Sequence, residues 1–320
     1  MSQMDGNALI SCFQNGLETA SKVGPIVGAI FAVIFLRKNT KDAEFEKLKA
    51  GKFREVADRL LESGHMTYTE FYKAANFLHV AELADQVFKH DYQNKADENQ
   101  KYDFDWYMRF YDIVGNISDE EMQALWARIL AGEIHRKGTY SLQLLDILKN
   151  FTQKQAELFN KVCSHCFISG DHVYIPNDNE YLQFANITYH DILDLDSLGL
   201  INSSGTTSLS VEVQPNRPSL LGNDMLRMVI EYSGQSNATQ EFSFLQFPFT
   251  AAGRELVTLI GKHGSEKDFL YFVKLLIKRN SIGSSFVISA KRIMVKDNSM
   301  WLEKIDLESD VSTPKSQESK

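Results

Sequence analysis

Apolar residues recur at helical spacing through much of the first half of the chain. Residues 67–88 place apolar side chains at steps of three and four, and Thr67 with Glu70 has the spacing of a capping box. A second amphipathic helix is indicated at residues 118–134, where a serine and a glutamate have the same spacing. These patterns predict an α-helical domain over residues 39–168.

The pattern changes after about residue 169. Strand-like alternation is found at residues 208–213, 226–232 and 242–249. Helical spacing returns at residues 250–260 and 268–279. A helix ending in Leu-Gly-Leu-Ile, a hairpin and then Thr-Ala-Ala-Gly-Arg-Glu-Leu resemble a winged-helix domain. We therefore predict an α+β, winged-helix-like domain over residues 169–296 and a polar, disordered tail over residues 297–320.

A long apolar segment lies close to the start of the chain. Residues 23–36 form an unbroken run of fourteen apolar residues, which spans about 21 Å as a helix against a hydrocarbon thickness of about 30 Å. A helix that begins near Asn7 recovers the missing length. Lysine and arginine are concentrated after the run, which by the positive-inside bias places the bulk of the chain in the cytoplasm. We therefore predict a transmembrane and oligomerisation helix at residues 1–38, and a mainly α protein.

This segment also carries a pattern for self-association. Small residues recur at every fourth position, at Gly16, Ala20, Gly24 and Gly28. On a helix they share one face, which allows close approach of a second helix. The polar residues of the same segment include Gln14, Asn15 and Glu18. Polar residues at membrane depth usually face a bundle interior, so several copies are predicted to enclose a polar pathway. The alternatives are a single membrane or interfacial anchor and a soluble core helix.

Composition narrows the class of protein. The chain has 320 residues, is 43% hydrophobic and carries a formal net charge of −8. That balance argues against a protein that coats long nucleic acid, because such a protein needs a broad basic surface. The three cysteines, Cys12, Cys163 and Cys166, do not form a disulfide framework and fit a reducing compartment.

Catalytic and metal-binding motifs are sparse. The sequence has no Walker A loop, no dinucleotide-binding glycine fingerprint, no H-E-x-x-H and no G-x-S-x-G. The Cys-Ser-His-Cys segment, with His172 after it, has zinc-ligand residue types. Because Cys163 and Cys166 continue the apolar spacing of the preceding helix, core packing is the favoured interpretation. We predict no enzymatic activity, no metal site and no cofactor.

Aromatic and basic residues are concentrated in residues 102–140. The candidate ligand-binding residues are Arg109, Arg128, Arg136, Lys137 and Tyr140. Guanidinium and ammonium groups beside aromatic rings suit the phosphates and bases of a short single strand. The alternative for the aromatic residues is core packing, since Trp106, Phe110 and Ile113 follow helical spacing.

Residues 105–159, with a tryptophan-containing helix and the segment Leu-Ala-Gly-Glu-Ile, resemble a bacterial domain family of unknown function. An N-terminal membrane segment joined to this core is similar to the ion-channel effectors of the Hailong anti-phage defence system. That resemblance implies a homo-oligomeric channel in the bacterial inner membrane, inhibited by short single-stranded oligodeoxyadenylate. It further implies that a partner nucleotidyltransferase makes this ligand. The alternative function is a membrane-tethered adaptor without channel activity.

Overall fold

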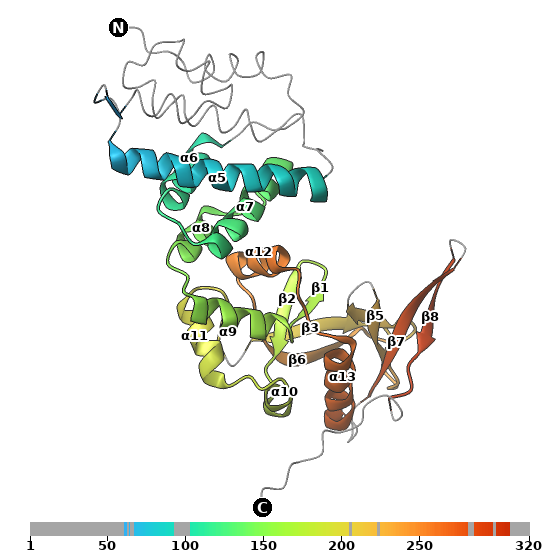
Figure 1. The fold of residues 1–320 in the computed structure, drawn as a ribbon. Coiled ribbons are helices and arrows are strands. Elements are labelled where there is room, and N and C mark those ends of the chain that lie inside the picture. Colours follow the sequence, from blue (N-terminus) through green and yellow to red (C-terminus); the bar gives the residue numbers. More distant parts are fainter. Residues whose placement is uncertain are drawn as a thin grey trace, which may run out of the picture. The chain divides into compact units, whose positions relative to one another are not determined.

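A computed structural model describes residues 61–62, 64, 67–92, 103–204, 207–222, 225–280, 285–296 and 299–307. The chain forms two compact units, Met1–Lys149 and Asn150–Lys320, which are treated separately below (Figure 1). The sequence places the end of the helical domain later, at residue 168. The helix that follows Asn150 therefore belongs to the second unit. The predicted membrane helix at residues 1–38 lies outside the described residues.

The described part of the first unit is helical. Its elements are α5 (Tyr68–Asp91), α6 (Phe104–Val114), α7 (Glu120–His135) and α8 (Leu142–Lys149). Thr67 and Glu70 form the predicted capping box at the start of α5. Asp103 caps α6 and Asp119 caps α7, each by accepting a hydrogen bond from a backbone N–H of the first turn. α5 runs across α6 and α7, and α6 contacts α8 (Figure 1).

Aromatic side chains fill the centre of these helices. Phe110 lies edge-to-face against Trp126, with ring centroids 5.6 Å apart, and stacks on Trp106 at 5.2 Å. Phe77 of α5 meets Tyr111 of α6 at 5.2 Å. All five side chains are buried. Trp106 and Phe110 are therefore core residues, which was the alternative offered by their spacing.

The second unit mixes helices and strands. Its helices are α9 (Gln153–Cys163), α10 (Asn179–Phe184), α11 (Tyr189–Ser197), α12 (Ala251–Ile260) and α13 (Glu266–Asn280). Its strands are β1 (Phe167–Ser169), β2 (His172–Pro176), β3 (Ser208–Val213), β4 (Ser219–Gly222), β5 (Leu226–Tyr232), β6 (Gln240–Pro248), β7 (Phe286–Lys296) and β8 (Ser299–Lys304). They form two antiparallel sheets with the orders β1-β2-β6-β3 and β4-β5-β7-β8.

Helices cover parts of these sheets. α13 packs against β7 and β5, on the face that buries Ile288 and Ala290 (Figure 1). α12 begins directly after β6, where Thr250 caps the helix and its hydroxyl donates to the carbonyl of Gly199 at 2.6 Å. The backbone of Gly253 meets the carbonyl of Leu200 so closely that a Cβ atom at Gly253 would overlap the oxygen. A glycine is therefore required at this helix position.

The prediction of a mainly α protein is wrong. Helix accounts for about 50% and strand for 24% of the described residues, and the two sheets exceed the small hairpin of a winged-helix domain. β8 lies within residues 297–320, where the sequence predicts a disordered tail. β1 and β4 have only three and four residues, and every residue of β8 is exposed, so these strands carry no alternation of buried and exposed positions that would identify them. Among the described residues, no helix combines the length and apolarity needed to cross a membrane.

Candidate functional site

The turn after α7 is built around a buried carboxylate. Glu133 is only 2% exposed. It accepts hydrogen bonds from the backbone N–H of Gly138 at 2.7 Å and from that of Tyr140 at 3.1 Å. The indole N–H of Trp106 donates to the carbonyl oxygen of Tyr140 at 2.8 Å. Residues 136–140 are therefore held to α7 and to α6 by charge-assisted and neutral hydrogen bonds.

Burial and hydrogen bonding act in opposite directions on this carboxylate. Desolvation is the largest influence and raises the pKa of Glu133, the N–H donors of Gly138, Tyr140 and Thr139 lower it, and the charge of Asp103 raises it. The pKa of Glu133 is therefore above its ordinary value. The group serves the turn and is too enclosed to meet a ligand.

The glycine of the Leu-Ala-Gly-Glu-Ile segment, Gly132, packs against the ring of Tyr140. A Cβ atom at Gly132 would lie 2.7 Å from Cε2 of Tyr140, so the glycine leaves room for the ring. The Tyr140 side chain is buried, with 4% exposed. Of the five candidate ligand-binding residues, Tyr140 thus packs in the interior, whereas Arg109, Arg128, Arg136 and Lys137 are exposed.

A group of basic and aromatic residues gathers at the C-terminal half of α7. The rings of Tyr92 and His135 are stacked, with centroids 4.3 Å apart and planes at 17°. Arg128 lies two helical turns before His135 on α7, and Arg136 and Lys137 follow the helix. We call Tyr92, Arg128, His135, Arg136 and Lys137 the α7 basic cluster.

Arg128 belongs to the same side of α7 as the stacked rings, and its charge contributes to the electrostatics of Tyr92. Burial raises the pKa of Tyr92, the charge of Asp91 raises it further, and the charge of Arg128 lowers it. Arg128 and His135 are seven residues apart on α7, so they share one side of the helix and lie about 10.5 Å apart along its axis. The cluster thus offers cations beside an aromatic pair, which is the combination that phosphates and bases need.

Arg109 has a different environment. It lies on α6, and its Nη1 is 3.8 Å from the carboxylate of Asp146 on α8. Both side chains are more than half exposed. Exposed ion pairs of this kind contribute about 0–1 kcal/mol, so the pair is easily exchanged for another anion. The partner of Arg109 is therefore a carboxylate of α8.

Tyr92 is the member of the cluster that sequence reasoning missed. It follows α5 and begins a polar stretch that reads as a linker. The sequence signal that could have identified Tyr92 was its position as a tyrosine at the end of a capped amphipathic helix. The predicted oligomerisation and pore residues, Gly16, Ala20, Gly24, Gly28, Gln14, Asn15 and Glu18, lie outside the described residues.

The cysteines of the second unit are enclosed. Cys163 ends α9, and Cys166 lies beyond it, in the turn before β1. Both are buried, and burial raises both thiol pKa values, that of Cys166 to about 12. The ring of His172 instead contacts Oε1 of Gln246 at 2.8 Å. Within the described ranges, no three histidine, cysteine, aspartate or glutamate residues are grouped to hold a metal ion.

A histidine, an aspartate and a serine meet at the start of α13. Nδ1 of His165 is 2.5 Å from Oδ1 of Asp268, and the backbone N–H and hydroxyl of Ser265 donate to Oδ2 of Asp268. In a nucleophilic triad the imidazole lies between the hydroxyl and the carboxylate. Here the carboxylate is central, so the arrangement caps α13 and does not activate the serine.

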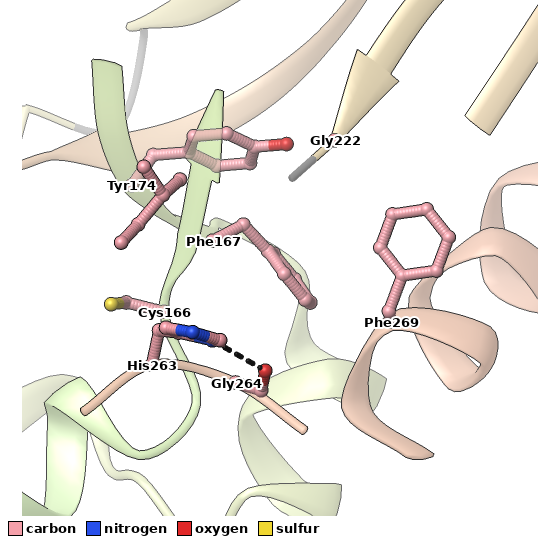
Figure 2. A pocket seen from close by; sticks show the side chains of 8 residues that line it. Cys166, Phe167, Tyr174, Gly222, His263, Gly264 and Phe269 are labelled. Atoms are coloured by element: carbon pink, nitrogen blue, oxygen red, sulfur yellow. Dashed lines mark hydrogen bonds between the residues drawn. The ribbon is translucent and has the colours of Figure 1, made fainter. Parts of the chain in front are cut away.

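A small crevice adjoins this cap. Figure 2 shows its lining, which includes Cys166, Phe167, Tyr174, His263 and Phe269. One of its polar groups has a partner nearby, since the His263 ring contacts the carbonyl of Gly264 at 3.1 Å. The thiol of Cys166 remains protonated at neutral pH because of its raised pKa. The crevice therefore lacks an activated nucleophile.

Comparison with known proteins places the chain in one family. The family described as protein of unknown function (DUF2806) matches residues 72–274. The chain belongs to this family. The match begins within α5 and ends within α13, so the DUF2806 region contains α7 and the crevice but not β7 or β8. No curated protein and no solved structure matches the chain.

Proposed function

We propose that this protein is a non-enzymatic effector that binds short single-stranded oligodeoxyadenylate and thereby controls an ion channel formed by several copies of the chain. The observation that supports ligand binding is the α7 basic cluster, in which Tyr92 stacks on His135 and Arg128 lies on the same side of α7 as His135. The channel component rests on the sequence of residues 1–38 and on the resemblance to anti-phage effectors.

The cluster suits a short ligand better than a long one. Arg128, Arg136 and Lys137 occupy the end of one helix and its following turn, which matches a few phosphates. The net charge of −8 opposes non-specific binding of long nucleic acid. An ordered turn also limits the conformational entropy lost on binding.

Replacing Arg128 with glutamate is expected to weaken oligodeoxyadenylate binding by about 10- to 100-fold, because a charge-assisted hydrogen bond contributes about 1.5–3 kcal/mol. The measurement is fluorescence anisotropy of a labelled oligomer with the full-length protein. Each lost phosphate contact also lowers the salt slope by about 0.7 for a single strand. Lys149→Glu, which makes the same charge change at the exposed end of α8, is the control. Equal losses in the two variants would contradict the assignment.

Ion flux from liposomes tests the channel component. Wild-type protein is expected to conduct ions without ligand and to be suppressed by oligodeoxyadenylate, since a ligand that binds the closed state more tightly shifts the population toward it. Replacing both Gly24 and Gly28 with leucine is expected to damage conduction, because bulky side chains separate closely packed helices. Absence of flux from protein confirmed in the bilayer would favour the tethered adaptor.

A further inference from the structure

Three cations lie side by side across one sheet of the second unit. Arg227 of β5 pairs in register with Lys291 of β7, and Lys291 pairs with Lys304 of β8. Residues in register point to the same face of a sheet, with neighbouring strands about 4.8 Å apart. Within the part of the chain that the structure describes, no carboxylate forms an ion pair with any of the three.

On the opposite face of the same strands, the positive charge of Arg292 is balanced by negative charges. Arg292 pairs in register with Glu303 and forms an ion pair with Glu266 of α13. Like charges placed directly opposite each other destabilise a sheet, whereas opposite charges stabilise it. The row of Arg227, Lys291 and Lys304 therefore lacks an internal structural reason, and an external anion would supply one.

Apolar residues continue the cationic face toward the β7–β8 turn. The next pair in register is Ile293 with Leu302, and the pair after it is Val295 with Met300. Val295 and Met300 are 72% and 73% exposed. Met225, 68% exposed, borders them, since its carbonyl accepts from the N–H of Ile293 at 2.8 Å. We call these residues and the cationic row the β7–β8 face.

The order of side chains on this face is directional. Toward the β7–β8 turn, the cationic row is followed by the two apolar pairs. Successive pairs are two residues apart along the strand, which is about 7 Å. The acids on the same face, Glu231 opposite Val287 and Asp306 beyond Lys304, lie on the far side of the cationic row. β8 is the edge strand of its sheet, so no further strand of that sheet borders it (Figure 1).

The chemistry of the face selects among partners. Single-stranded nucleic acid is held by stacking on aromatic rings, but the exposed apolar residues here are aliphatic, and Trp301 pairs with Met294 on the opposite face. A second copy packed face to face would bring another cationic row toward the first. An anionic bilayer fits both parts, because aliphatic side chains enter the headgroup boundary while lysine and arginine contact lipid phosphates.

We propose that the β7–β8 face binds the surface of a membrane that contains anionic lipid. The contact is peripheral and belongs to the second unit, so it does not depend on residues 1–38 or on the α7 basic cluster. Its polar anchors are Arg227, Lys291 and Lys304. Its inserting side chains are Met225, Leu302, Val295 and Met300.

A fluorophore on the face tests this contact directly. Met300→Cys, in a chain with Cys12→Ser, gives one accessible thiol because Cys163 and Cys166 are buried. An environment-sensitive dye at this position is expected to shift its emission to the blue with vesicles of phosphatidylcholine and phosphatidylglycerol. Vesicles of phosphatidylcholine alone are expected to cause no shift. The same dye at Leu193→Cys on α11 reports on a different surface.

Charge variants separate this contact from other binding. Replacing Arg227, Lys291 and Lys304 together with glutamine is expected to raise the vesicle concentration for half-maximal shift about 100-fold, since each cation contributes about fivefold. The variant is expected to fold, because the substitutions remove like-charge repulsion. Lys154, Lys262 and Lys267 are exposed, and their triple glutamine variant makes the same charge change as a control.

Four results would overturn the proposal. The first is that the dye at position 300 does not respond although the protein sediments with anionic vesicles. The second is that the two triple variants lose the same affinity for vesicles. Alternatively, the dye shifts with protein concentration in the absence of lipid, which identifies a second copy as the partner. A shift with oligonucleotide and none with vesicles would identify a nucleic-acid surface.

Discussion

Replacing Gly253 with alanine is expected to lower the free energy of unfolding of the second unit by about 3 kcal/mol or more. The new Cβ atom would overlap the carbonyl oxygen of Leu200, which is backbone and cannot rotate away. α12 would have to move from the segment that precedes β3, although Thr250 holds it there through the carbonyl of Gly199. Chemical denaturation of the full-length protein, followed by near-ultraviolet circular dichroism, measures the loss.

The sign of the stability change caused by Gly253→Ala distinguishes the close contact with Leu200 from the helix propensity of alanine. Alanine in place of a helix glycine stabilises an exposed helix by about 1 kcal/mol, so propensity alone predicts a more stable protein. Ala251→Gly makes the reverse change at an exposed position of α12 and is expected to cost about 1 kcal/mol. A Gly253→Ala protein as stable as the wild type would show that α12 does not approach Leu200 as described.

Replacing Glu133 with alanine is expected to destabilise the first unit by about 3 kcal/mol. The backbone N–H groups of Gly138 and Tyr140 lose their acceptor while they remain enclosed, and a buried unsatisfied donor costs about 1–3 kcal/mol. The removed side chain also leaves a cavity beside α7. Thermal and chemical unfolding are followed by tryptophan fluorescence in a chain with Trp301→Phe, because the two tryptophans that remain, Trp106 and Trp126, are both in this unit.

Glu121 provides the matched control for this prediction. It is exposed in the first turn of α7, so Glu121→Ala removes a favourable interaction with the helix dipole of about 0.3–1 kcal/mol. Glu133→Gln is expected to fall between the two, since its amide retains one acceptor oxygen but presents a donor to the second N–H. If the Glu133→Ala and Glu121→Ala proteins were equally stable, the Glu133 carboxylate would not hold the turn after α7.

Local signals in the sequence predict helix starts well. The capping box of Thr67 with Glu70 is confirmed. At α7 the sequence favours Ser118 as the cap, but Asp119 accepts the hydrogen bond from the N–H of Met122. Serine and aspartate cap helices about equally well, so the spacing alone does not decide between neighbours.

Contacts between distant parts of the chain could not be predicted in the same way. The stacking of Tyr92 on His135 depends on how α5 and α7 pack. The row of Arg227, Lys291 and Lys304 depends on the register of the strands. A shift of one residue would turn the side chains of a strand to the opposite face of the sheet. Arg128 was identified from residue type, but its position beside an aromatic pair follows only from the fold.

The buried cysteines have a practical consequence. Cys163 and Cys166 lie in the second unit, and their raised pKa values suppress the thiolate that reacts with alkylating reagents. In a chain whose Cys12 has been replaced, alkylation then requires the second unit to open. The rate of thiol labelling under native conditions thus measures how often that unit opens, and it does so through two residues that are native to the chain.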